Sequence, residues 1–175
     1  MLSVALELGL EGGWDGVQMR EVSSRAEVAL GTLYRYFPSK EHLLVSVMLQ
    51  QVEDLADRLA VRPPEGSDPV ERVVDVLRRA NRNLQRQPEV TKAMIRALVS
   101  GNTDVAPVVT SVREAMRRII TDALGEGADG DAGLVLVVDL LSDIWLAALV
   151  SWISGAEEAD AVVPKLTSAA QVLLG

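Results

Sequence analysis

The sequence predicts an all-α protein of nine helices. Apolar residues recur at helical spacing along most of the chain, and stretches that alternate apolar and polar residues, as strands do, are nearly absent. Glycine, proline, asparagine and aspartate interrupt this pattern at intervals that suit helix ends. With 175 residues, of which 49% are hydrophobic and 24% charged, the chain has a globular composition and can form one large core or two small ones.

Three short helices are expected first. They cover about Met1–Gly9, Gln18–Ala26 and Leu30–Phe37. The segment EGGWDG ends the first helix and Pro38 ends the third, because glycine and proline interrupt helices.

Six further helices follow, and most of them are longer. Ser39 is a suitable N-cap for the first of them, and Asp68 followed by Pro69 is a suitable start for the second. The change in helix length predicts an N-terminal domain of residues 1–45 and a C-terminal domain of residues 46–175. The six helices cover about residues 40–60, 69–87, 88–100, a segment after GNTD that ends near 124, 134–154, and a last one that starts between 160 and 164 and ends at 174.

The composition narrows the function classes. A net charge of −8 argues against a general nucleic-acid binder with a broad basic surface, but it leaves room for a small, local DNA-contacting face. The chain has no cysteine, which excludes disulfides and thiolate metal sites. Its longest apolar run, Leu134–Ile153, is broken by Asp139 and Asp143, and Met1–Leu10 lacks the basic start of a signal peptide. A cytoplasmic location is therefore the expectation.

The helix expected over Leu30–Phe37 has two different sides. Leu30, Leu33 and Phe37 fall on one side, where they can pack on the preceding helix. The other side and the flanks carry polar groups: Thr32, Tyr34, Arg35 and Tyr36. A helix, a short turn and a second helix of this size form the helix-turn-helix layout, whose second helix enters the major groove of DNA.

The polar groups of this helix suit DNA. Arginine can read guanine edges, threonine can reach a base edge or a thymine methyl group, and tyrosine hydroxyls can bind phosphate oxygens. Gly31 lets the helix approach the duplex closely. Lys40, beside the Ser39 cap, places a positive charge where a phosphate can dock. A packed helical hairpin that does not touch DNA is the alternative that spacing alone leaves open.

The segment VQMREVSSRAEVALGTLYRYFPSKEHLLVSVM, residues 17–48, resembles the DNA-binding signature of TetR-family transcriptional regulators. The resemblance implies an N-terminal helix-turn-helix DNA-binding domain of three helices and a C-terminal ligand-binding and dimerisation domain of six. Two positions depart from the family pattern: Gln18 stands where a Thr or Ser cap is frequent, and Glu27 where the turn often has glycine. The DNA contacts that the resemblance implies are Arg20, Thr32, Tyr34, Arg35, Tyr36 and Lys40.

Residues 1–45 are net acidic, whereas members of the family usually carry a basic arm before the first helix. We expect such an arm upstream of Met1, and only a few, local phosphate contacts. The affinity for a palindromic operator should then depend on salt through only a handful of counterions per dimer.

Two stretches of the C-terminal domain, Asn81–Ala97 and Ser142–Ile153, resemble the subgroup of this family that represses cholesterol catabolism in actinobacteria. That likeness implies an effector that is a steroid acid, carried as its coenzyme A thioester. A fatty acyl-CoA or a drug-like apolar ligand is the alternative effector, and activation is the alternative to repression.

Asn81 falls on the apolar seam of its helix, where a buried amide costs on the order of 1–3 kcal/mol unless it is paired. It can bond a neighbouring backbone group or line a ligand cavity. The other candidate lining residues, each of which can also be ordinary core, are Met94, Met116, Trp145 and Trp152. Four arginines on the helix of Asn81 form either a solvated face or an anchor for the phosphates of an acyl carrier: Arg78, Arg79, Arg82 and Arg86.

The sequence assembles no catalytic, metal or cofactor site. Asp139 and Asp143 lie on one helix face without a histidine or a nucleophile beside them, so they should pair with arginines or border a dimer seam. The helices over about 134–154 and 160–174 are apolar on more than one face, which predicts a homodimer seam of two helices from each chain. An α-helical enzyme and an interaction module without DNA contact are the rival interpretations.

Overall fold

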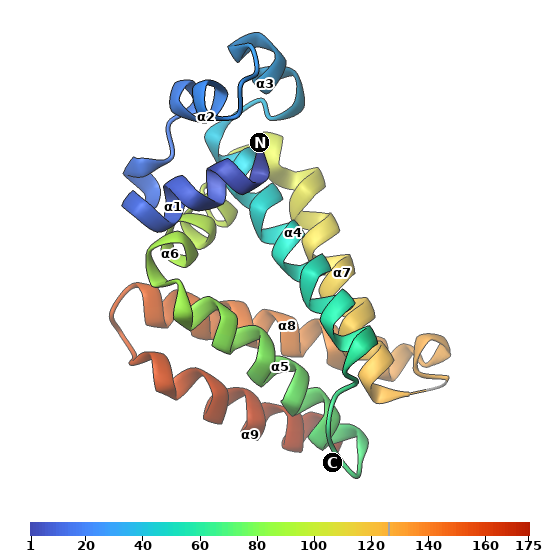
Figure 1. Ribbon diagram of the computed structural model, residues 1–175. Coiled ribbons are helices and arrows are strands. Elements are labelled where there is room, and N and C mark those ends of the chain that lie inside the picture. Colours follow the sequence, from blue (N-terminus) through green and yellow to red (C-terminus); the bar gives the residue numbers. More distant parts are fainter. Residues whose placement is uncertain (126) are drawn as a thin grey trace. The chain divides into compact units, whose positions relative to one another are not determined.

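The computed structural model describes residues 1–125 and 127–175, and over these residues the prediction of an all-α protein with nine α-helices is confirmed (Figure 1). Three short 3₁₀ turns lie at Thr103–Val105, Ala128–Gly130 and Ala159–Ala161. The helices are α1 Leu2–Gly16, α2 Met19–Arg25, α3 Leu30–Tyr36, α4 Lys40–Val61, α5 Pro69–Arg86, α6 Pro88–Leu98, α7 Ala106–Leu124, α8 Ala132–Ile153 and α9 Val162–Leu174.

The helices divide into two compact units. The head unit consists of Met1–Glu53 and Arg86–Val112, so α6 belongs with the three N-terminal helices and the first part of α4. The body unit consists of Asp54–Gln85 and Arg113–Gly175. The predicted domain division at residue 45 stays a prediction.

In the head unit α1 packs against α6, and Gly9 lies at the contact. A Cβ atom on Gly9 would lie 2.5 Å from Cγ2 of the buried Val90, which is closer than carbon atoms approach. The prediction that EGGWDG ends the first helix agrees with the backbone, because helical geometry is broken at Gly12 and Gly13; α1 extends to Gly16 only by including a second short helical piece beyond this kink. Gly13 has a φ of +55°, so this pair of glycines both ends the regular helix and bends the chain.

The contact between α1 and α6 gives a testable prediction. Gly9→Ala should lower the free energy of unfolding by about 1–3 kcal/mol, because the new methyl group overlaps Val90. Gly12→Ala is the matched control, since no atom lies within 4 Å of a Cβ at that position. Urea unfolding measures the free energy of unfolding of both glycine variants. Val90→Ala should also lower the free energy of unfolding by less in the Gly9→Ala chain than in the wild type. Equal losses from the two glycine variants would contradict the close packing.

The turn between α2 and α3 has the hydrogen bonds of a Schellman motif. The Val28 N–H donates to the Ser23 carbonyl over 3.0 Å, and the Glu27 N–H donates to the Ser24 carbonyl over 3.2 Å. Glu27 has a φ of +54° and is the only non-glycine residue with a positive φ among those described. The turn therefore forms with glutamate in a left-handed conformation that glycine adopts with less strain.

Two predicted helix starts are confirmed by side-chain hydrogen bonds. The His42 N–H donates to Ser39 Oγ over 3.1 Å at the start of α4. The Glu71 N–H donates to Asp68 Oδ1 over 2.8 Å at the start of α5. Each cap satisfies a backbone donor that lacks an intrahelical partner.

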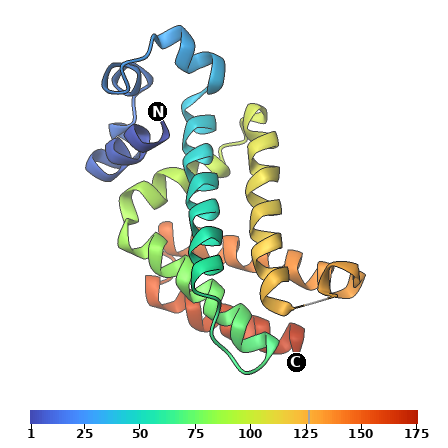
Figure 2. The ribbon, with the colours of Figure 1, turned by 45° about the vertical axis from the view of Figure 1, so that its right-hand side comes forward.

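In the body unit α8 and α9 run side by side (Figures 1 and 2). α8 has a mean hydropathy of 2.1 over an 18-residue window, so by length and composition alone it could cross a membrane despite its two aspartates. Both aspartates pair with arginines of α7, Asp139 with Arg117 at 2.8 Å and Asp143 with Arg113 at 3.2 Å. The predicted arginine pairing is therefore confirmed, and it fits a helix packed in a folded domain. Only 22% of the apolar window is buried within the protomer.

Candidate DNA-binding surface and effector site

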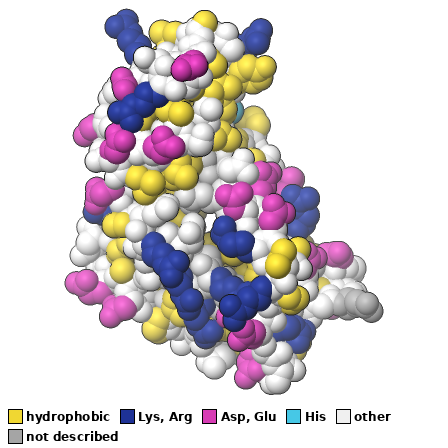
Figure 3. All heavy atoms as spheres, viewed as in Figure 1, with side chains coloured by type: hydrophobic (Ala, Val, Ile, Leu, Met, Phe, Trp, Pro, Cys, Tyr) yellow, Lys and Arg dark blue, Asp and Glu magenta, His cyan; other side chains and the backbone are white. Residues whose placement is uncertain are grey.

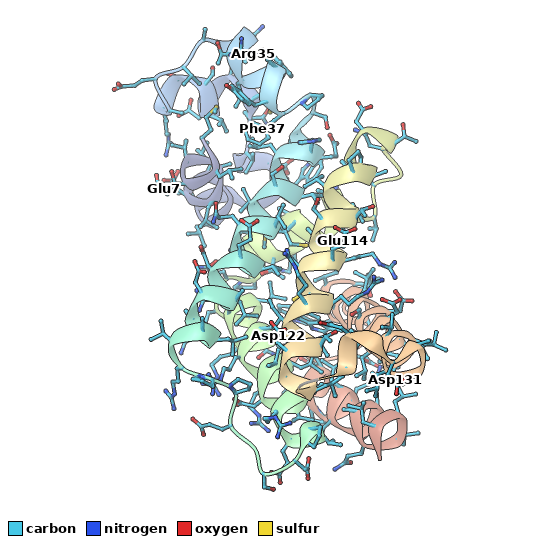
Figure 4. All side chains as sticks on the ribbon, turned by 90° about the vertical axis from the view of Figure 1, so that its right-hand side faces the viewer. Glu7, Arg35, Phe37, Glu114, Asp122 and Asp131 are labelled. Atoms are coloured by element: carbon cyan, nitrogen blue, oxygen red, sulfur yellow. The ribbon has the colours of Figure 1, made fainter. Side chains whose placement is uncertain are left out.

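The outer side of α3 is polar and open. Leu33 is fully buried, whereas Tyr34 and Tyr36 are 46% and 55% exposed. Arg35, labelled in Figure 4, is exposed, and its guanidinium carbon lies 5.2 Å from the centroid of the Tyr36 ring. The predicted division of this helix into a packed side and an open side is confirmed.

The first turn of α3 leaves room for a close partner. Gly31 is exposed, and no atom lies within 4 Å of where its Cβ would be. The structure leaves four of the six predicted DNA contacts exposed, Arg20, Tyr34, Arg35 and Tyr36, and half-buries the other two, Thr32 and Lys40. None of the six is enclosed in the core, and the assignment of DNA contacts to them stays a prediction.

Lys40 has neighbours that the sequence did not suggest. Its Nζ lies 4.3 Å from the centroid of the Trp14 ring, and the Arg96 guanidinium carbon lies 4.2 Å from the same centroid. Burial lowers the pKa of Lys40 and the charge of Arg96 lowers it further, while Asp15 and Glu41 act in the opposite direction. No signal in the sequence brings α1 and α6 together here, because the contact depends on tertiary packing.

Asn81 is fully buried, and both polar atoms of its side chain lack a hydrogen-bond partner within the described residues. The alternative of a bond to a neighbouring backbone group is therefore wrong. Trp145 is 8% exposed, and its Nε1 also lacks a partner there. Both residues belong to the body unit. Buried polar groups are usually paired, so each of these needs an explanation.

The remaining predicted ligand residues have mixed positions. Met116 is buried and Trp152 is half-buried, both in the body unit. Met94 is fully buried but lies on α6 in the head unit. The structure thus places four of the five candidates in one unit and the fifth in the other.

The arginines of α5 also differ from one another. Arg79 pairs with the buried Asp75 at 2.6 Å, and Arg78 lies 3.5 Å from the same carboxylate, so both arginines have a partner within α5. Arg82 and Arg86 are exposed. Figure 3 shows basic side chains gathered over α5.

Comparisons with known proteins identify the family. Residues 1–47 match the model of bacterial regulatory proteins of the tetR family, and residues 66–173 match the model of the tetracyclin repressor-like C-terminal domain. The chain belongs to the TetR family. Regulators of this family bind operator DNA and dimerise.

Several TetR-family relatives are similar over the full chain. The chain is 38% identical over 175 residues to the HTH-type transcriptional repressor KstR of Rhodococcus jostii, covering all of this chain and 81% of that protein. It is 35% identical over 178 residues to KstR of Mycobacterium tuberculosis, covering all of this chain and 79% of that protein. These relatives support the resemblance found in the C-terminal domain.

Solved structures show the same TetR fold. A TetR transcriptional regulator from Rhodococcus sp. RHA1 has a TM-score of 0.90 and 35% identity, covering 99% of this chain and 92% of that chain. The regulator FadR from Bacillus subtilis, solved in complex with stearoyl-CoA, has a TM-score of 0.71 and 20% identity, covering 98% of this chain and 95% of that chain. The second likeness is evidence for the fold alone.

The turn residue Glu27 gives a prediction for DNA binding by this TetR-family chain. Glu27→Gly should raise the free energy of unfolding by about 1 kcal/mol, because glycine relieves the left-handed strain. It should also tighten operator binding, since a negative charge near the phosphates is removed. Glu27→Gln separates the effects, because it removes the charge and keeps the strain. Equal stability of the two variants would contradict the strain, and unchanged operator affinity in both would contradict a position near DNA.

Proposed function

We propose that the chain is a homodimeric transcriptional repressor of lipid or steroid catabolism genes, released from a palindromic operator by an apolar effector. The open polar side of α3 carries this proposal. Arg20, Thr32, Tyr34, Arg35, Tyr36 and Lys40 are its candidate DNA contacts. A dimer presents two such helices to half-sites about one helical turn or a small multiple apart.

The effector site is proposed to lie in the body unit around Asn81 and Trp145. A ligand that reaches Asn81 would offer partners to an amide that has none within the described residues. Asn81 supplies a donor and an acceptor, and Trp145 supplies a donor, so the ligand should carry oxygen atoms on an apolar body. Met116 and Trp152 are candidate lining residues in the same unit, whereas the prediction for Met94, which lies in the head unit, stays separate from this site.

A steroid acid carried as its coenzyme A thioester is the effector class that we favour. Repressors similar to this chain over its full length include KstR proteins, and a steroid acid combines an apolar body with oxygen groups. The exposed Arg82 and Arg86 are candidate contacts for the carrier phosphates. A fatty acyl-CoA is the second candidate, because FadR proteins of the same fold were solved with stearoyl-CoA and lauroyl-CoA.

The dimer is proposed to form through α8 with help from α9. The side of α8 left exposed in the protomer follows helical spacing and is mostly apolar: Leu136, Leu140, Asp143, Ala147 and Val150. Val172 adds an exposed apolar side chain on α9. An apolar stripe of this length favours a self-complementary seam, and an obligate seam should bury more than about 2,000 Å².

A gel shift against the DNA upstream of the protein's own gene tests the repressor proposal. The wild-type chain should bind, and Arg35→Ala and Lys40→Ala should each weaken binding by about tenfold or more. Arg118→Ala is the matched control, since Arg118 is exposed on α7 in the body unit. Addition of a steroid-acid CoA thioester should release the DNA. An effector acts in this way only if it binds the DNA-incompetent state more tightly. Absence of binding to any upstream segment would favour an enzyme or an interaction module.

A further inference from the structure

Three side chains from three helices meet in the head unit at the start of α4. Trp14 comes from the last turn of α1, Lys40 is the first residue of α4, and Arg96 lies on α6. The Lys40 ammonium and the Arg96 guanidinium both lie over the Trp14 ring, 4.3 Å and 4.2 Å from its centroid. All three belong to the same compact unit, so their contacts are internal to it.

The Trp14 ring restricts where the Lys40 ammonium can lie. The face of an indole carries negative electrostatic potential and attracts a cation at this distance. A free lysine side chain samples many rotamers, and a ligand that binds it must order them. A lysine already held against a ring loses less freedom when a phosphate arrives, so the ring pre-organises the contact.

Arg96 adds a second positive charge to the same ring. Burial is the main cause that lowers the pKa of Lys40, and the Arg96 charge lowers it further, while Asp15 and Glu41 act in the opposite direction. No ion pair of Arg96 or of Lys40 is seen within the described residues, so no carboxylate holds either side chain in a salt bridge there. A docking phosphate would offset the repulsion between the two cations.

We propose that Trp14 and Arg96 are positioning residues for DNA binding: the Trp14 ring holds the Lys40 ammonium where an operator phosphate docks, and the Arg96 guanidinium, which lies over the same ring, keeps the ring in place. This inference rests on the proposed DNA-binding function of the head unit. It adds two residues outside the helix-turn-helix, one of them on α6, to the parts that set operator affinity. Arg96 and Trp14 act through Lys40, so their effect should depend on Lys40 being present.

A double-mutant cycle on the full chain tests this dependence. Arg96→Met and Trp14→Leu should each weaken operator binding by about three- to tenfold in the wild-type background. In a Lys40→Met background the same changes should weaken binding by less than about twofold. Arg96→Lys should retain most of the affinity, because it keeps the cation. Arg118→Met is the control for the loss of one positive charge elsewhere, and unfolding curves show which variants fold.

A merely structural role would give a different result. If Trp14 and Arg96 only stabilised the head unit, their variants would weaken binding equally with and without Lys40. That additive outcome would overturn the proposal. Lys40→Met should also make the dependence of log K on log salt shallower by about one counterion per protomer, and Arg96→Met should do so only while Lys40 is present.

Lysine NMR tests the positioning without DNA. The chain has only three lysines, Lys40, Lys92 and Lys165, so reductive ¹³C-methylation, which keeps the positive charge, gives few signals to assign. The Lys40 methyl signal should be shifted upfield by the Trp14 ring, and Trp14→Leu should return it to the position of the other two. A Lys40 signal without this shift would overturn the proposal directly. If the Lys40 signal is shifted upfield but the wild-type chain binds no upstream DNA, the proposed function is wrong, whereas the contact between Lys40 and Trp14 is supported.

Discussion

Leu136→Arg should convert the protein from a dimer to a monomer and reduce operator affinity by more than about 100-fold. Leu136 is 59% exposed in the protomer, so the substitution leaves the fold of one chain intact. In a two-fold seam each substitution appears twice, and both charges would have to be buried without partners. A monomer also loses the linked binding of two half-sites, which supplies most of the affinity of a dimeric reader. Sedimentation measures whether the variant is a dimer or a monomer, and fluorescence anisotropy measures its affinity for the operator.

Val61→Arg is the matched control for this change. Val61 is 88% exposed at the end of α4 and does not belong to the exposed stripe of α8. The variant should remain dimeric and should bind the operator as the wild type does. Dissociation caused by Val61→Arg, or an unchanged dimer in Leu136→Arg, would place the seam elsewhere.

Asn81→Leu should have two effects of opposite direction. Without effector the free energy of unfolding should rise by about 1–3 kcal/mol, because an unpaired buried amide is replaced by an apolar side chain of the same branched shape. The thermal shift caused by a steroid-acid CoA thioester should fall, because the effector loses its polar partner, and the concentration that releases the operator should rise about tenfold or more. A variant that only damaged the fold would lower both the free energy of unfolding and the thermal shift caused by the effector.

Thr91→Val is the control for a change from polar to apolar in the core. Thr91 is fully buried in the head unit and, unlike Asn81, is not without a partner. Its substitution should not raise stability and should leave the effector concentration for release unchanged. If Asn81→Leu lowered the stability of the free protein while Thr91→Val did not, the amide would have an internal partner and the proposed effector contact would fall.

Much of the fold follows from local signals in the sequence. Ser39 and Asp68 mark helix starts because their side chains accept backbone N–H groups, and the structure shows those bonds. The two sides of α3 follow from helical spacing alone. The short helical piece of α1 beyond Gly12 and Gly13 is not predicted by such signals, because those two glycines mark only where the first helix is broken.

The candidate sites also contain some features that the sequence predicts and others that it does not. The burial of Asn81 could be predicted from its place on an apolar seam, but its lack of a partner depends on what every neighbouring helix presents. The stacking of Lys40 and Arg96 on Trp14 joins residues far apart in the sequence, so no local pattern carries it. The grouping of α6 with the helix-turn-helix in one unit likewise could not be predicted from helix lengths.

The central claim is that the outer side of α3 lies in a groove of operator DNA, and site-specific crosslinking tests it most directly. The chain has no cysteine, so Ala29→Cys places a single thiol on an exposed residue at the start of α3 without removing a proposed contact. Labelled with a benzophenone crosslinker, this thiol should attach to operator DNA, and effector should suppress the crosslink. Ser168→Cys, exposed on α9, should give none. A stable protein–operator complex in which the label at position 29 never reaches DNA would contradict the account.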